Sequence, residues 1–142
     1  MDFDALSDLN WLAVIVAGLA YFALGALWYA PPVFGKPWMA AGGQQMGQTG
    51  ERPNPAIYVT PLIAQIVAAI ALGMIAESTS TNTFEEGLVL GLVAGVGFAV
   101  TTMLTTATFE TQKPNGMVWG LINAAYHLVG LVIAAVIIAV WN

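Results

Sequence analysis

Four long apolar segments constrain the fold of this chain more than any other feature. They cover residues 9–30, 56–76, 84–108 and 117–141, and each is long enough to cross the hydrocarbon core of a bilayer as a helix, which takes about 20 mostly apolar residues. Only 8% of the chain is charged, whereas soluble domains carry about 25%. The sequence therefore predicts one domain, residues 1–142, that is all-α and integral to a membrane. Its four transmembrane helices would form an antiparallel bundle.

Breaker and capping residues mark the ends of these segments. Pro31-Pro32 closes the first, because proline removes an amide donor and fixes φ. Thr83 and Glu86 have the spacing of a capping box at the start of the third. Pro114-Asn115-Gly116 separates the third from the fourth.

The charges are distributed unevenly over the connecting segments. All three basic residues, Lys36, Arg52 and Lys113, lie in loops 31–55 and 109–116. In the N-terminal segment and in the connection between the second and third spans, all charged residues are acidic. The positive-inside rule then predicts both termini outside and the two basic loops in the cytoplasm. With a net charge of -5, the chain lacks the basic surface that nucleic acid requires, so no nucleic-acid partner is expected.

The loop 31–55 is long for so small a protein. Its first half carries apolar and aromatic side chains, and its second half is polar and rich in glycine and proline. We expect an interfacial segment on the membrane surface, followed by a flexible polar stretch.

Glycines recur at every fourth position in the third span, at Gly87, Gly91 and Gly95. Small residues at this spacing let a second helix backbone approach closely, which favours helix association in lipid. We expect a packing seam here, with its partner either in the same chain or in a neighbouring copy.

Polar side chains inside the spans form a second pattern. Asn123, Tyr126 and His127 lie near one another on the fourth span, and polar groups in lipid usually face a partner. If spans three and four form an antiparallel hairpin, Thr101 and Thr105 lie at their depth. We therefore predict a polar cluster between these two spans, which Gln65 of the second span could join.

His127 admits three interpretations. It could be a neutral side chain that ties two helices together by hydrogen bonds, a group that relays protons or binds a polar solute, or an axial ligand to a tetrapyrrole. The first is preferred, so no cofactor is expected. The chain has no cysteine and one histidine, and it contains no recognised catalytic motif. We predict neither a metal site nor an enzyme.

The junction after the first span resembles a known family. It reads Gly25-x-x-Trp28-Tyr29-x-Pro31, then Phe34-Gly35-Lys36-x-Trp38, and the fourth span reads Asn123-Ala-Ala-Tyr126-His127. Nearly the whole chain resembles the bacterial membrane family catalogued as domain of unknown function 1761. The resemblance implies a four-span inner-membrane protein and brings no activity with it. It also implies that the Asn123–His127 stripe belongs with an interfacial elbow made of Trp28, Tyr29, Pro31, Phe34, Gly35, Lys36 and Trp38.

These patterns support two hypotheses for function. In the preferred one, the chain is a structural or accessory protein of the inner membrane that packs with itself or with a larger membrane complex. In the alternative, copies assemble into a channel or carrier for a small solute or protons, with the intramembrane His/Asn/Thr cluster as its polar site. The lipid bilayer is the surrounding partner in both.

Overall fold

The computed structural model describes residues 4–43 and 55–141, and these residues form helices and turns with no strand. The elements in order are α1 (Ala5–Asp8), α2 (Trp11–Trp28), the π-helical η1 (Pro31–Gly35), α3 (Lys36–Gly42), α4 (Ala56–Thr79), α5 (Phe84–Ala94), the π-helical η2 (Gly95–Val100), α6 (Thr101–Phe109) and α7 (Gly116–Trp141). α5, η2 and α6 run together as one long helix.

Four helices are long and apolar enough to cross a membrane: Trp11–Trp28, Ala56–Thr79, Phe84–Phe109 and Gly116–Trp141. They coincide with the four predicted spans to within three residues at each end. The all-α, four-span fold class is confirmed, and the composition of these helices indicates a multi-pass membrane protein.

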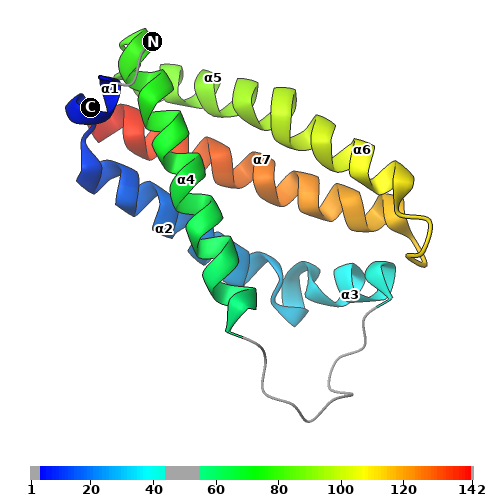
Figure 1. Cartoon of the computed structure of the whole chain (residues 1–142). Coiled ribbons are helices and arrows are strands. Elements are labelled where there is room, and N and C mark those ends of the chain that lie inside the picture. The colour runs from blue at the N-terminus through cyan, green and yellow to red at the C-terminus, as the bar shows by residue number, and fades with distance from the viewer. Residues whose placement is uncertain (1–3, 44–54, 142) are drawn as a thin grey trace.

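Helix α7 is the centre of the bundle. The long helix α5–η2–α6 lies along one side of it and α2 along another, while α4 crosses both α2 and α7 at a steep angle (Figure 1). Val14 and Tyr21 of α2 are the largest fully buried side chains among the described residues. Most other buried positions are alanines or glycines, so the helices pack closely around small side chains.

The glycine seam of the third span contacts α7 of the same chain. A Cβ added at Gly91 would lie 2.5 Å from the Cα of Val132, and one added at Gly87 would lie 2.9 Å from the Cα of Val136. Gly95 packs in the same way against Leu128. In this structure the partner of the seam is therefore intramolecular.

The π-helical segment η2 keeps this seam facing α7. Positions four apart run past a full turn of a 3.6-residue α-helix by about 40° per step. A π turn accommodates an extra residue and so reduces that overshoot. As a result Ala107, twelve residues beyond Gly95, again faces α7, where it packs against Gly120.

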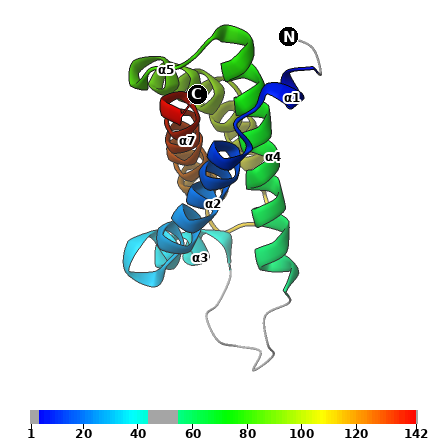
Figure 2. The same ribbon diagram turned by 90° about the vertical axis from the view of Figure 1, so that its left-hand side faces the viewer.

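One end of the bundle is fastened by polar contacts. The predicted capping box is confirmed, with the Glu86 amide donating to Thr83 Oγ1 at 3.3 Å and the Thr83 amide donating to Glu86 Oε2 at 3.1 Å. At the same end, Asn10 Nδ2 donates to the carbonyl of Trp141 at 2.8 Å. The α4–α5 turn therefore lies at the same end of the bundle as α1 and the end of α7 (Figures 1 and 2).

The first half of the predicted loop 31–55 is helical, as η1 and α3. Gly35 permits the tight bend after α2, because any Cβ there would overlap the carbonyl of Tyr29. The Gly35 amide donates to the carbonyl of Ala30 at 3.0 Å and closes the π turn. Residues 44–54, which include most of the predicted flexible polar stretch, lie outside the described residues.

Candidate functional site

Polar and aromatic side chains from four helical elements meet beside α7. We call this group the polar cluster. It comprises Tyr21, Trp28, Tyr29, Trp38, Gln65, Asn123, Tyr126 and His127. These residues come from α2 and its C-cap, α3, α4 and α7.

Asn123 accepts hydrogen bonds from two residues of the interfacial elbow. Its Oδ1 accepts hydrogen bonds from the Tyr29 hydroxyl at 2.6 Å and from Trp38 Nε1 at 3.2 Å. Its Nδ2 donates to the carbonyl of Trp119, one turn earlier on α7, at 2.9 Å. The Tyr29 and Trp38 rings also contact each other, with centroids 5.0 Å apart. One buried amide thus joins the end of α2 and helix α3 to α7.

His127 is held by a tyrosine from α2. The Tyr21 hydroxyl and His127 Nδ1 are 2.6 Å apart, and Tyr21 is only 2% exposed. The Tyr21 ring lies directly over Gly130, where a Cβ would overlap it. His127 itself is half-buried, and its Nε2 forms no hydrogen bond with any described residue.

Tyr126 links α7 to both α4 and α2. Gln65 Nε2 donates to the Tyr126 hydroxyl at 3.0 Å, and this hydroxyl donates to the carbonyl of Tyr21 at 3.3 Å. Gly25 makes room for it, since a Cβ there would lie 3.0 Å from the Tyr126 hydroxyl oxygen. The ring also contacts Tyr29, with centroids 5.2 Å apart.

The elbow residues divide into two groups. Trp28 donates from Nε1 to the carbonyl of Ile122 at 3.2 Å and stacks on Phe34 with centroids 4.6 Å apart. The hydrogen bond holds the Trp28 indole against α7, and the ring contact joins it to η1. In contrast, Pro31 opens η1 and Lys36 opens α3, and both are exposed.

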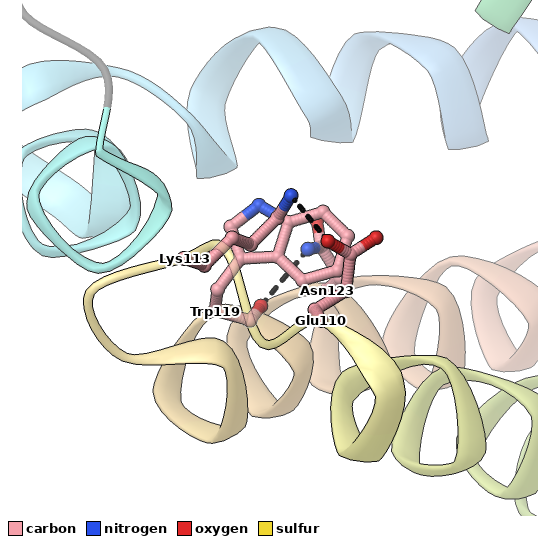
Figure 3. A network of polar contacts seen from close by, with 4 residues as sticks. All are labelled: Glu110, Lys113, Trp119 and Asn123. Carbon is pink, nitrogen blue, oxygen red and sulfur yellow. Dashed lines mark hydrogen bonds and ion pairs between the residues drawn. The ribbon is translucent and has the colours of Figure 1, made fainter.

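The far end of α3 is fastened at the α6–α7 turn. The Asn115 amide donates to the carbonyl of Ala41 at 3.0 Å. Lys113 Nζ lies 2.9 Å from Glu110 Oε2 and 4.5 Å from the centroid of the Trp119 ring. Figure 3 marks the ion pair between Lys113 and Glu110. Figure 3 also shows the hydrogen bond from Asn123 back to Trp119, so this turn and the polar cluster share a residue.

The threonines expected in the cluster do not join it. Thr101 and Thr105 are exposed, and their hydroxyls donate to carbonyls of their own helix at Gly97 and Thr101, at 2.8 and 2.9 Å. Their depth is close to the expected one, because they lie between two contacts of the same pair of helices. These contacts join Gly95 to Leu128 and Ala107 to Gly120. The predicted face was wrong, since the small residues of the seam occupy the side that faces α7. Membrane threonines commonly bond the carbonyl four residues earlier in this way.

Sequence reasoning missed Tyr21, and it did not predict the hydrogen bonds from the Trp28 and Trp38 indoles to α7. A signal for Tyr21 was present, because it is the one tyrosine in the interior of the first span. A tyrosine hydroxyl buried among apolar helices usually has a hydrogen-bond partner. Gln65, in contrast, was correctly expected to lie beside the residues of α7.

The buried polar atoms of the cluster are all paired, whereas His127 Nε2 has no partner among the described residues. Among the described residues, no buried side-chain nitrogen or oxygen atom lacks a hydrogen-bond partner, and no three His, Cys, Asp or Glu residues lie close enough to hold a metal ion. What the arrangement does is join α2, α3, α4 and α7. The absence of a cofactor, with ligation of a tetrapyrrole by His127 as the less favoured alternative, stays a prediction.

Comparison with known proteins gives the family but no function. Residues 12–139 match the family model described as "Protein of unknown function (DUF1761)". No curated protein and no solved structure matches the chain. The match covers nearly all of the bundle, from the first turn of α2 to the last turn of α7, and it confirms the resemblance seen at the elbow. The chain belongs to the DUF1761 family, whose function is unknown.

Proposed function

We propose that this protein is a structural or accessory component of a membrane, without catalytic activity, and that it acts by packing with another copy of itself or with a larger membrane complex. The observation that carries the proposal is the polar cluster, whose buried polar atoms are all paired. Buried hydrogen bonds that satisfy one another rigidify a core and specify one arrangement of its parts. Such a cluster is suited to holding a fixed shape.

The outer face of η2 and α6 supports packing with a further helix. The Gly87, Gly91 and Gly95 seam is already occupied by α7, so an external partner needs a different surface. Gly97, Thr101 and Thr105 follow at steps of four on the uncovered side, and a Cβ at Gly97 would have no heavy atom within 4 Å. Small residues at this spacing are typical of helix contacts in membranes.

We further propose the inner membrane of a bacterium as the location, with both termini outside. In support, Asp8, Glu77 and Glu85 lie at the end of the bundle where the α4–α5 turn meets α1 and the end of α7. Lys113 lies in the α6–α7 turn, at the opposite end. This separation of charge matches the positive-inside rule, with loops 31–55 and 109–116 in the cytoplasm.

Site-specific photo-cross-linking in intact membranes tests the packing proposal. A photoreactive phenylalanine analogue replaces Phe98, which is 71% exposed on the α5–η2–α6 helix. We expect one discrete cross-linked protein band. The same analogue at Phe22, on α2, is the control for nonspecific capture. Lipid adducts alone at Phe98, or the same bands from both positions, would contradict a specific helix partner there.

A second function, proton or solute handling by an oligomer, is favoured by one observation. His127 is half-buried, is bonded through Nδ1 to Tyr21 at 2.6 Å, and keeps Nε2 without a described partner. Imidazole is the side-chain group whose ordinary pKa lies nearest to neutral pH, so histidine is well suited to relaying protons. Proton flux into liposomes that is abolished by His127→Ala and retained by Thr105→Ala, an exposed position, would establish this alternative. Equal flux for both variants would eliminate it.

A further inference from the structure

An apolar groove separates α4 from α5, away from the polar cluster. The two helices share the turn at residues 80–83 and then diverge (Figure 2). The groove has a volume of about 480 Å³. Its walls include Ile75 and Thr79 of α4 and Glu85, Val89, Leu90 and Val93 of α5.

The α5 wall of the groove is a stripe with a polar head and an apolar tail. Glu85, Val89 and Val93 are four residues apart, so they lie along one side of the helix. At 1.5 Å per residue the stripe is about 12 Å long. Val89 is 60% and Val93 is 61% exposed. An apolar chain laid along the stripe would cover both valines and also contact Ile75 across the groove.

The head of the groove carries a carboxylate available to a ligand. Glu86 is already engaged, because its Oε2 accepts from the amides of Asn82 and Thr83 at 2.9 and 3.1 Å. Glu85 is exposed, and within the described ranges it forms neither an ion pair nor a side-chain hydrogen bond. Asp8 and Glu77 lie at the same end of the bundle, where the described residues include no Lys or Arg.

We propose that this groove binds one phospholipid with a primary-amine headgroup, of the phosphatidylethanolamine type. One acyl chain lies along Val89 and Val93, and the ammonium group donates hydrogen bonds to the Glu85 carboxylate. The apolar stripe binds the acyl chain but does not distinguish between lipids, since every lipid class has acyl chains. Charge complementarity selects the head, because an anionic headgroup would be repelled by this end of the bundle. The inference does not depend on the proposed packing function.

Native mass spectrometry of the detergent-purified protein tests this proposal. The protein is mixed with phosphatidylethanolamine, phosphatidylcholine or phosphatidylglycerol of identical acyl chains, and the bound fraction is measured for each. We expect one phosphatidylethanolamine molecule to bind about two to five times more tightly than the other two lipids, the range for a solvent-accessible ion pair. Phosphatidylcholine separates hydrogen bonding from charge, since its headgroup has no N–H donor.

Two pairs of variants locate the site. Glu85→Gln should abolish the preference for the amine lipid, whereas Asp8→Asn, the same loss of charge at the same end, should retain it. Val93→Trp should fill the groove and weaken binding of all three lipids. Val96→Trp, at a position 50% exposed that does not line the groove, should not.

Equal binding of the three lipids by the unmodified protein would overturn the proposal, as would an unchanged preference in Glu85→Gln. Because the Glu85 side chain is exposed, its substitution leaves the helix packing intact. The headgroup test therefore decides the matter even where Val93→Trp lowers stability.

Discussion

A methyl group added at Gly91 should force α5 away from α7. The added Cβ would lie 2.5 Å from Val132 Cα, 3.1 Å from its amide nitrogen and 3.1 Å from the carbonyl oxygen of Leu131. All three are backbone atoms, which cannot turn aside as a flexible side chain can. Carbon atoms in contact are about 3.5–4.0 Å apart, so the helices must separate by about 1 Å at this position.

This separation should lower the free energy of unfolding by an amount that can be predicted. Overpacking of a well-packed core destabilises by about 1–3 kcal/mol. For a chain of this size, 1 kcal/mol corresponds to roughly 2–4 °C in the unfolding midpoint. Gly91→Ala should therefore lower the midpoint by about 2–12 °C, combining those two ranges.

Gly97→Ala is the matched control. It lies six residues later on the same continuous helix, and a Cβ there would have no heavy atom within 4 Å. The two substitutions make the same chemical change, so the difference in helix propensity between glycine and alanine cancels between them. Thermal unfolding of both proteins in one detergent, followed by circular dichroism, gives the comparison. A midpoint lowered equally by both substitutions, or unchanged by Gly91→Ala, would refute the assignment of this seam to α7.

Three further predictions concern the polar cluster and the topology. Tyr21→Phe should destabilise the protein by about 1–3 kcal/mol, because it leaves His127 Nδ1 unpaired. Tyr58→Phe, at a tyrosine that is 58% exposed, should change the unfolding midpoint little. Equal effects of the two substitutions would show that the hydrogen bond of Tyr21 contributes nothing to stability. Asn123→Ala removes the acceptor for Tyr29 and Trp38, so hydrogen exchange of the α3 amides should accelerate at least tenfold while exchange in α5 stays unchanged, and slow α3 exchange would argue against a tie through Asn123. In a chain without native cysteine, a single cysteine at Ser7 should react with a membrane-impermeant reagent added outside intact cells, and one at Thr111 should react only after lysis; the reverse pattern would invert the proposed topology.

The main elements of the fold could be predicted because lipid imposes a simple rule on the sequence. Each span must be about 20 apolar residues long, and its ends must carry residues that stop or cap a helix. Thr83 with Glu86 and the Pro31-Pro32 pair supplied those signals, so the four helices were found close to their observed bounds. The α3 helix was not predicted as a separate element, because Pro37 and the flanking glycines resemble loop composition.

The polar cluster could be predicted only in part. The depth of a residue in the membrane follows from counting along the helix, but the direction in which its side chain points does not. Asn123, Tyr126 and His127 share a face at any register of the fourth helix, and they do lie together. Thr101 and Thr105 depend on the rotation of the third helix. That rotation is set by the glycine seam and by the π turn in η2, which the apolar pattern does not reveal.

The most direct test of the proposed packing role is native mass spectrometry of the protein released into the gas phase from its own membrane vesicles, without detergent. The account predicts a complex of fixed stoichiometry, either with further copies of this chain or with a different membrane protein. A chain that leaves the membrane alone, bound only to lipid, would contradict the packing role, and His127-dependent proton flux in liposomes would then favour the alternative.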